Sequence, residues 1–183
     1  MENTATLSTG ARNKMAVTYG AILGLIYIVL TTVNYLTVAN FILFYVMKLL
    51  SYVLFIVIVG IFARMIRNAN GGFIEFKEVF GSIFLMVLVA GFMTYLYNYI
   101  YMYVIDPDLM VKMKDASLQF MEKSKATDEQ LDKTASDFDK QIADAKKLNI
   151  GKSLLYFLGS VVLDCLFGLI PAAIVKKQRP MFE

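Results

Sequence analysis

Histidine and tryptophan are both missing from this chain, which has a single cysteine, Cys165, and three prolines. Without histidine, the sequence lacks the commonest general base, the commonest metal ligand and the usual pH-sensitive side chain. One cysteine can form neither an internal disulfide bond nor a cysteine-rich zinc site. We therefore predict no catalytic residue, no cofactor and no metal ion, and we expect that the protein is not an enzyme.

Charged residues are scarce as well. They make up 18% of the sequence, hydrophobic residues make up 58%, and the mean hydropathy is +0.59. A typical soluble domain is about 25% charged. The net charge of +3 is small, and the basic residues flank apolar segments instead of forming a surface stripe. This distribution gives no reason to expect a nucleic-acid partner.

Long apolar segments are abundant instead, and four of them occupy residues 15–36, 42–63, 79–105 and 153–175. An α-helix rises about 1.5 Å per residue, so about 20 apolar residues cross a hydrocarbon core of about 30 Å. We predict an all-α polytopic membrane protein in which residues 1–183 form one membrane domain surrounded by the lipid bilayer. The first run exceeds the apolar part of a secretory signal, about 7–15 residues, so we expect a retained helix.

Basic residues predict the orientation of the four runs, because positive side chains near a span resist translocation. They flank alternate ends of the runs: Arg12 and Lys14 before the first, Arg64, Arg67 and Lys77 between the second and third, and Lys176, Lys177 and Arg179 after the fourth. The connection between the first two runs, residues 37–41, carries no charge. We predict that both termini lie in the cytoplasm.

Residues 106–152, between the third and fourth runs, are predicted to form an extracytoplasmic helical hairpin. Asp106 and Pro107 suit the N-cap and the first position of one helix. Residues 127–130 form a capping box for a second helix, which carries apolar residues at helical spacing. Nine lysines and ten acidic residues nearly cancel in this segment, although its first two lysines lie close to the third run and oppose this orientation. The hairpin is either a solvated cap over the bundle or a surface for a protein partner.

Tyrosine occupies every second position at the end of the third run: Tyr95, Tyr97, Tyr99, Tyr101 and Tyr103. In a soluble protein, this period of two is typical of a strand. An open strand in lipid would leave its backbone groups unpaired, so we predict a helix. Because tryptophan is absent, we expect these rings to lie at the membrane–water boundary, with a ligand-stacking site as the alternative.

Asp164 lies near the centre of the fourth run, where a charged side chain costs about 2.5–3.5 kcal/mol. Its carboxyl group must therefore face protein or water. Ser160, Asp164 and Gly168 are spaced by four residues and share one small, polar face of the helix. We predict that this face is directed into the bundle.

Counting along the other runs gives Asp164 possible partners. Tyr27 and Tyr52 should lie at nearly the same depth as Asp164. Lys48 should lie about 7 Å nearer the outer face, given the rise of an α-helix, and its side chain can extend outward. We therefore favour a hydrogen bond from a tyrosine to Asp164 over an ion pair with Lys48. The candidate polar site comprises Asp164, Tyr27, Tyr52, Lys48 and Ser160.

Two further motifs leave alternatives open. Gly20 and Gly24 form a Gly-x-x-x-Gly motif, which permits close helix packing. Together with Gly168 they are candidate helix-packing residues, and packing within the protein is favoured over dimerisation, although an oligomer is possible. Arg64 and Arg67 are one turn apart and could hold a lipid headgroup, although membrane anchoring is the simpler interpretation.

Several segments of the chain resemble a known family. They are Arg67-Asn68 with residues 70–80, Tyr99 to Tyr101 followed by residues 105–108, the helix start at residues 127–130, and the lysines after the last run. In this order they resemble a bacterial family of four-helix membrane proteins known only as the domain-of-unknown-function 4199 family. The resemblance covers nearly the whole chain from about Arg12 onward. It implies a protein of the bacterial inner membrane with this topology, and it carries over no activity, ligand or catalytic residue.

The sequence thus predicts an integral membrane protein that acts through interaction, as an accessory or scaffold protein. It would meet a protein partner through the hairpin of residues 106–152 or through a face of the bundle. The alternative is a small transport or proton-coupled membrane component that uses Asp164.

Overall fold

The computed structural model describes residues 6–146 and 150–178 of the chain. Within these residues the fold consists of six α-helices and a short π-helix: α1 (Thr9–Leu36), α2 (Phe41–Ala69), α3 (Phe76–Ile100), the π-helix η1 (Tyr101–Ile105), α4 (Leu109–Lys123), α5 (Asp128–Lys146) and α6 (Ile150–Val175). The described part of the chain contains no strand, which confirms the all-helical prediction. Arg179 and the part of the predicted hairpin at residues 147–149 lie outside the described residues.

Four of the helices are long and apolar enough to cross a membrane: Thr9–Leu36, Phe41–Ala69, Phe76–Ile105 and Leu154–Val175. Large apolar side chains cover their outer surface, as shown by Val104 and Ile174, each 73% exposed. Water would penalise this surface, whereas lipid does not. The chain is therefore a multi-pass membrane protein, as its hydropathy predicts.

Three of the helices extend beyond the predicted apolar runs at the end where the basic residues lie, α1 and α2 by more than α3. α1 begins at Thr9, because the Ser8 hydroxyl accepts a hydrogen bond from the backbone of Ala11 at 3.2 Å and caps the helix. α2 continues to Ala69 and stops at the Asn70-Gly71-Gly72 turn. Both glycines of this turn have positive φ, 74° and 82°, which other residues rarely adopt.

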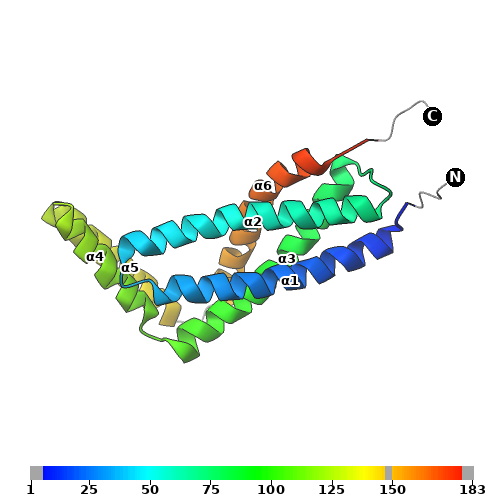
Figure 1. The fold of residues 1–183 in the computed structure, drawn as a ribbon. Coiled ribbons are helices and arrows are strands. Elements are labelled where there is room, and N and C mark those ends of the chain that lie inside the picture. The colour runs from blue at the N-terminus through cyan, green and yellow to red at the C-terminus, as the bar shows by residue number, and fades with distance from the viewer. Residues whose placement is uncertain (1–5, 147–149, 179–183) are drawn as a thin grey trace.

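The bundle has two distinct ends (Figure 1). Both ends of the described chain lie at one of them, which we call the terminal end, and α4 and α5 lie at the other, which we call the α4–α5 end. α1 and α2 run side by side along the front of the bundle in this view, with α3 and α6 behind them. This arrangement follows from four spans that alternate in direction.

α3 is the helix against which α1 and α6 pack most closely. A methyl group added to Gly20 would lie 2.8 Å from the Met86 carbonyl oxygen of α3. On α6, a methyl group added to Gly168 would lie 2.8 Å from a side-chain carbon of Ile83. The small residues thus allow the helices to pack closely within the protein. In lipid the hydrophobic effect does not drive helices together, so the van der Waals contacts made by this close packing stabilise the bundle instead.

The tyrosine-rich end of the third span is helical, as the argument from backbone pairing predicts. It changes from α3 to η1 at Tyr101. Tyr101 is 6% exposed and packs on Tyr35 of α1 with ring centroids 4.7 Å apart. Tyr99 and Tyr103 stack on each other on the exposed side, with centroids 4.6 Å apart. Of the five alternating tyrosines, Tyr101 therefore faces inward, whereas Tyr99 and Tyr103 lie on the exposed side.

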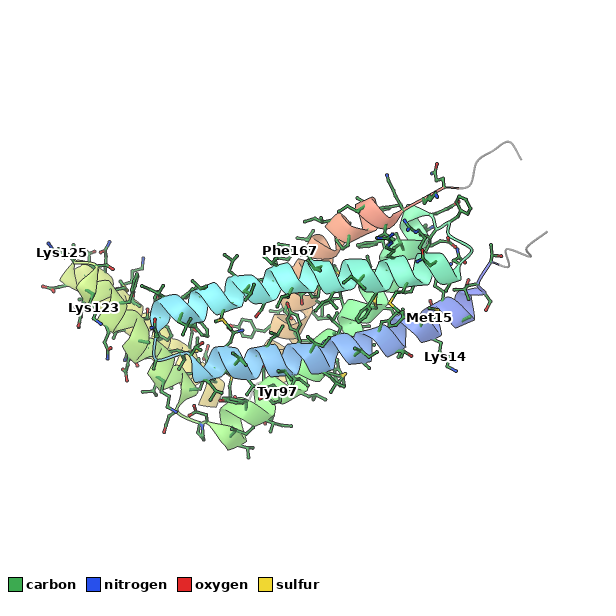
Figure 2. The ribbon with its side chains drawn as sticks, in the orientation of Figure 1. Lys14, Met15, Tyr97, Lys123, Lys125 and Phe167 are labelled. Carbon is green, nitrogen blue, oxygen red and sulfur yellow. The ribbon has the colours of Figure 1, made fainter. Side chains whose placement is uncertain are left out.

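α4 and α5 lie beside each other and project from the bundle, with Lys123 and Lys125 near the far tip (Figure 2). An ion pair of 2.6 Å joins Lys114 of α4 to Asp139 of α5. The capping box at the start of α5 is present: the Thr127 hydroxyl accepts a hydrogen bond from the Gln130 backbone, and the Gln130 side chain accepts one from the Thr127 backbone. α4 also contacts the spans, because Phe120 stacks on Phe41 at 4.6 Å.

One prediction about α4 is wrong. We expected Asp106 to cap this helix and Pro107 to be its first residue, but α4 begins at Leu109 after Asp108. The Asp106 carboxylate instead accepts hydrogen bonds from the Lys112 ammonium group at 2.8 Å. The Asp106 carboxylate thus binds the charged Lys112 side chain and not the backbone N–H groups at the start of α4, because hydrogen bonds between charged groups are stronger.

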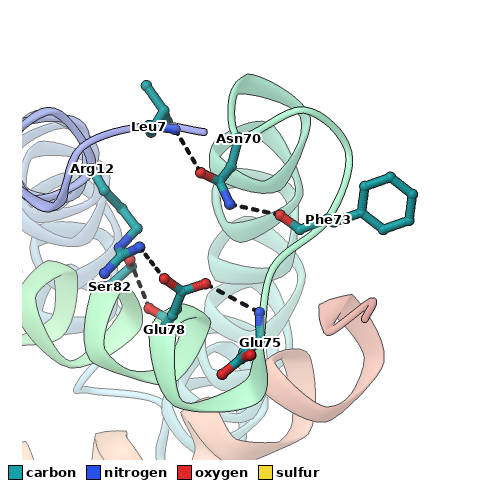
Figure 3. A network of polar contacts seen from close by, with 7 residues as sticks. All are labelled: Leu7, Arg12, Asn70, Phe73, Glu75, Glu78 and Ser82. Atoms are coloured by element: carbon teal, nitrogen blue, oxygen red, sulfur yellow. Dashed lines mark hydrogen bonds and ion pairs between the residues drawn. The ribbon is translucent and has the colours of Figure 1, made fainter. Parts of the chain in front are cut away.

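The turn between α2 and α3 contacts both ends of the described chain. The side chain of Asn70 accepts a hydrogen bond from the Leu7 backbone at 2.8 Å and donates one to the Phe73 carbonyl at 2.7 Å (Figure 3). Ile74 exchanges two backbone hydrogen bonds of 2.9 Å with Lys177. This short segment therefore ties the start and the end of the chain to each other.

Two arginines at the terminal end bind protein groups. Arg12 forms a 2.6 Å ion pair with Glu78 of α3 (Figure 3). Arg67 donates a hydrogen bond of 3.3 Å to the Val175 carbonyl, at the C-terminus of α6. A cation there compensates the unpaired carbonyls and the negative end of the helix dipole. One guanidinium nitrogen of Arg67 thus binds α6, whereas its buried Nε has no partner among the described residues. The headgroup interpretation stays a prediction.

Candidate polar cavity between the spans

A cavity of about 260 Å³ lies between α1, α2, α3 and α6 in the half of the bundle near α4 and α5. Its walls are formed by Tyr27, Leu30, Thr31, Asn34, Tyr35, Phe44, Lys48, Ser51, Tyr52, Phe55, Val87, Ala90, Gly91, Thr94, Asn98, Ser160 and Asp164. More than half of these residues carry a polar or charged group. Polar side chains in membrane spans usually face the bundle interior or a polar cavity, because contact with lipid would be costly.

All five residues of the predicted polar site line this one cavity: Asp164, Tyr27, Tyr52, Lys48 and Ser160. They come from three different spans, so their convergence depends on the depth of each residue in the bundle. Whether the cavity is a functional site stays a prediction, but the structure brings its proposed members together.

Asp164 itself is half-buried and has no hydrogen bond or ion pair to any residue that the structure describes. Tyr27 and Tyr52 line the same cavity as Asp164. Tyr27 nevertheless donates its hydrogen bond to the Ser51 carbonyl, at 3.3 Å. The expected hydrogen bond from a tyrosine to Asp164 is therefore not formed among the described residues.

Lys48 does not pair with Asp164 either. Its ammonium nitrogen lies 5.9 Å from the ring centroid of Phe44, one turn nearer the start of α2. This direction leads toward the α4–α5 end, where the side chain reaches more polar surroundings. The depth argument made from the sequence explains this geometry, because Lys48 is too near the end of its helix to turn inward.

Asn34 and Ser51 form a polar contact in the cavity wall that the sequence did not single out. The Asn34 amide nitrogen donates to the Ser51 hydroxyl at 3.1 Å, and the Ser51 hydroxyl donates to the Met47 carbonyl at 2.9 Å. The side-chain oxygen of Asn34 is buried and lacks a partner. Both residues were visible as polar positions in apolar runs, but their pairing depends on how α1 and α2 are aligned.

The two ends of the cavity are closed by different means. At the α4–α5 end, the buried residues Val38, Phe44, Tyr101 and Leu109 form a small apolar cluster. Toward the terminal end, a larger core of buried residues fills the bundle, and Leu23, Val59 and Ile83 in it are fully buried. No lining residue lies beyond Tyr27 on α1 or Phe55 on α2 in that direction, so the cavity occupies only one half of the bundle.

The side of the cavity between α2 and α6 is the open one. Among the lining residues, only Lys48 and Tyr52 of α2 and Ser160 of α6 are exposed at the surface of the bundle. The lining residues of α1 and α3 are buried or half-buried. A molecule entering the cavity would therefore pass between α2 and α6.

Residues 18–177 match the model of a family described as protein of unknown function (DUF4199). The chain belongs to this family. The match covers nearly all of the four spans and the whole of α4 and α5, in agreement with the resemblance found in the sequence. Neither the curated proteins nor the solved structures gave a match to the chain. The DUF4199 description brings no activity to the cavity, so its chemistry is argued from the residues themselves.

Proposed function

We propose that this membrane protein binds a small polar solute in the cavity between its spans, with Asp164 as the principal binding group. One observation carries the proposal: a half-buried carboxyl group opens into a polar cavity and has no partner among the described residues. A charged side chain near the centre of a span costs about 2.5–3.5 kcal/mol. A bound solute would offset this cost, whereas the observed fold does not.

The orientation of the protein is part of the proposal. We infer that it lies in the bacterial inner membrane with both termini in the cytoplasm, because Arg12, Arg64, Arg67, Lys176 and Lys177 gather at the terminal end. The α4–α5 end and the cavity would then face the extracytoplasmic side. The filled core toward the terminal end separates the cavity from the cytoplasm. The open side between α2 and α6 lies in the extracytoplasmic half of the bundle, so this conformation would be the outward-facing one of a transport component.

Binding without covalent chemistry is the simplest role for this site. The cavity lining contains no cysteine and the chain contains no histidine. The hydroxyls of Ser51 and Ser160 both donate to backbone carbonyls, at 2.9 and 2.8 Å, and neither contacts a base that would activate it. These observations support the inference that the protein is not an enzyme.

Native mass spectrometry of the full-length protein, extracted with its surrounding lipids, tests this function. We expect a small-molecule adduct on the wild type that is lost in Asp164→Asn. Asp132→Asn is the matched control, because Asp132 is exposed on α5 and far from the cavity in the chain. An adduct that survives Asp164→Asn, or a wild type that never carries one, contradicts the proposal.

A second candidate function is interaction with a protein partner through α5. Leu131, Phe138 and Ile142 form one apolar face of this helix, and each remains half-exposed although α4 packs beside it. An amphipathic helix that is not fully covered can bury this face against another protein. The accessory or scaffold role predicted from the sequence would use this surface.

Crosslinking mass spectrometry in native membranes tests the interaction role. The double substitution Phe138→Lys with Ile142→Lys places charge on the apolar face, and we expect it to remove crosslinks from α5 to a partner. Gln141→Lys places one charge on the exposed face and should leave the crosslinks in place. If no partner is crosslinked to the wild type, or if both variants retain the crosslinks, α5 is not the interaction surface.

A further inference from the structure

We propose that the solute is a small organic cation that carries N–H groups, a primary amine in its ammonium form, with its nitrogen bound at Asp164. This inference rests on the proposed function and names the class of molecule that the cavity would take. It is drawn from the balance of hydrogen-bond donors and acceptors in the cavity wall.

Most of the hydroxyl and amide donors assigned in the wall are already engaged by protein acceptors. These donors are the Tyr27 hydroxyl to the Ser51 carbonyl (3.3 Å), the Asn34 amide to the Ser51 hydroxyl (3.1 Å), the Tyr35 hydroxyl to the Asn98 side-chain oxygen (3.1 Å), the Ser51 hydroxyl to the Met47 carbonyl (2.9 Å), the Thr94 hydroxyl to the Ala90 carbonyl (2.9 Å) and the Ser160 hydroxyl to the Phe157 carbonyl (2.8 Å). The donors of the wall that make no hydrogen bond to a described residue are the hydroxyls of Thr31 and Tyr52, the Asn98 amide and the Lys48 ammonium group.

Two acceptors are also left unpaired in the same wall, and one of them carries the negative charge of the cavity. The carboxyl group of Asp164 makes no hydrogen bond to the described residues, and the buried side-chain oxygen of Asn34 has no partner. Asn34 is only 9% exposed, so bulk water does not supply the hydrogen bond that this oxygen lacks. Unpaired buried acceptors cost free energy, and a ligand rich in N–H groups would satisfy them.

The charge and the aromatic rings near Asp164 point in the same direction. A carboxylate in a low-polarity site binds a cation with N–H groups more strongly than it binds a neutral donor. Tyr27 meets Phe55 edge to face at 5.6 Å, and both rings line the cavity with Tyr52. Aromatic faces attract cations and disfavour anions. An anionic solute would meet both the carboxylate and these rings.

The position of Lys48 limits the length of the cation. Its ammonium group is directed toward Phe44 and the α4–α5 end, so positive charge lies at that rim of the cavity. A second positive group on the ligand would be repelled there. The volume of about 260 Å³ and the open side between α2 and α6 suit a monoamine with a short apolar chain.

Thermal unfolding of the full-length protein in lipid nanodiscs tests this inference with defined probes at equal ionic strength. We expect butylammonium to raise the Tm by about 5 °C at a hundredfold excess over its Kd. Tetramethylammonium has the charge without N–H groups and should raise it far less. Butan-1-ol, butanoate and sodium ions should have no effect. Equal stabilisation by tetramethylammonium, butanoate or sodium ions overturns the inference.

Variants separate this inference from the proposed function. Asp164→Asn should weaken the Kd for butylammonium by at least about tenfold, the change expected when a charged hydrogen-bond partner is lost. Asp132→Asn should leave it unchanged. If Asp164→Asn does not fold, the order of the probes on the wild type still decides the outcome. If native spectra show an adduct that depends on Asp164 but butylammonium is not the preferred probe, only the amine inference is contradicted. If the wild type carries no adduct, the proposed function is contradicted as well.

Discussion

Gly24 of α1 lies so close to Met93 of α3 that a methyl group added to it would be 2.9 Å from the Met93 sulfur. One turn earlier, a methyl group on Gly20 would lie 2.8 Å from the Met86 carbonyl oxygen. The two obstacles differ, because a methionine side chain can move and a helix backbone cannot. The Gly-x-x-x-Gly motif is thus occupied inside the protein, against α3.

Alanine at these two glycines should therefore have graded effects. We expect Gly20→Ala to lower the free energy of unfolding by about 1–3 kcal/mol, the usual range for overpacking, and Gly24→Ala to lower it less. Gly159 on α6 has no atom within 4 Å of an added methyl group, so it is the matched control. Gly159→Ala should be neutral or stabilise the helix by up to about 1 kcal/mol. Equilibrium unfolding in mixed micelles measures all three, and equal effects at Gly20 and Gly159 would refute this packing.

The ion pair between Arg12 and Glu78 should contribute more to stability than the ion pair between Lys114 and Asp139. Arg12 is 12% exposed in its side chain and Glu78 36%, whereas Asp139 is 61% exposed. Glu78→Gln removes the charge but keeps an oxygen that can cap the backbone of Glu75. We expect a loss of about 1 kcal/mol for Glu78→Gln and a few tenths for Asp139→Asn, as solvent screening requires. A larger loss for Asp139→Asn in the same unfolding assay would contradict this order.

Titration of Lys112 should be shifted to higher pH. Its hydrogen bond to Asp106 raises the pKa of Lys112 above its ordinary value. A raised pKa means that the contact stabilises the fold below the ordinary lysine pKa, and that this contribution is lost as the pH rises through the raised value. NMR of the lysine ammonium groups should show a lower Lys112 pKa in Asp106→Asn and no change in Asp132→Asn. An unchanged Lys112 pKa in Asp106→Asn would exclude the contact.

The spans and the shared depth of Tyr27, Tyr52 and Asp164 in the polar cavity were predictable because both depend on distance along a helix. Hydropathy sets where a helix enters lipid, and counting residues from that point gives the depth of Tyr27, Tyr52 and Asp164. The same count explains why Lys48 extends toward the α4–α5 end. The position of a span and the depth of a residue in it can both be predicted from a single helix, without knowing how the helices pack.

Contacts that depend on how two helices are rotated and crossed were not predictable. The pairing of Asn34 with Ser51 and of Arg67 with the Val175 carbonyl requires the mutual alignment of two spans. The start of α4 was missed for a related reason. The Asp106 carboxylate had two possible partners, the helix backbone and the Lys112 side chain, and the sequence does not rank them.

Access to position 164 from water tests the central claim most directly. The claim is that Asp164 faces a polar cavity that opens between α2 and α6, in the half of the bundle near α4 and α5. A cysteine introduced there by Asp164→Cys, with Cys165→Ala removing the native thiol, should react with a membrane-impermeant, positively charged methanethiosulfonate applied from the side of the membrane where α4 and α5 lie. The sidedness of the vesicles is set by labelling Lys133→Cys on α5.

Val162→Cys provides the comparison, because Val162 is 60% exposed on the apolar surface of α6. A thiol in lipid forms little thiolate and reacts slowly. We predict rapid modification of Asp164→Cys from the side on which Lys133→Cys is labelled, and slow modification of Val162→Cys. Asp164→Cys that is as unreactive as Val162→Cys, or that reacts only from the opposite side, would contradict the account.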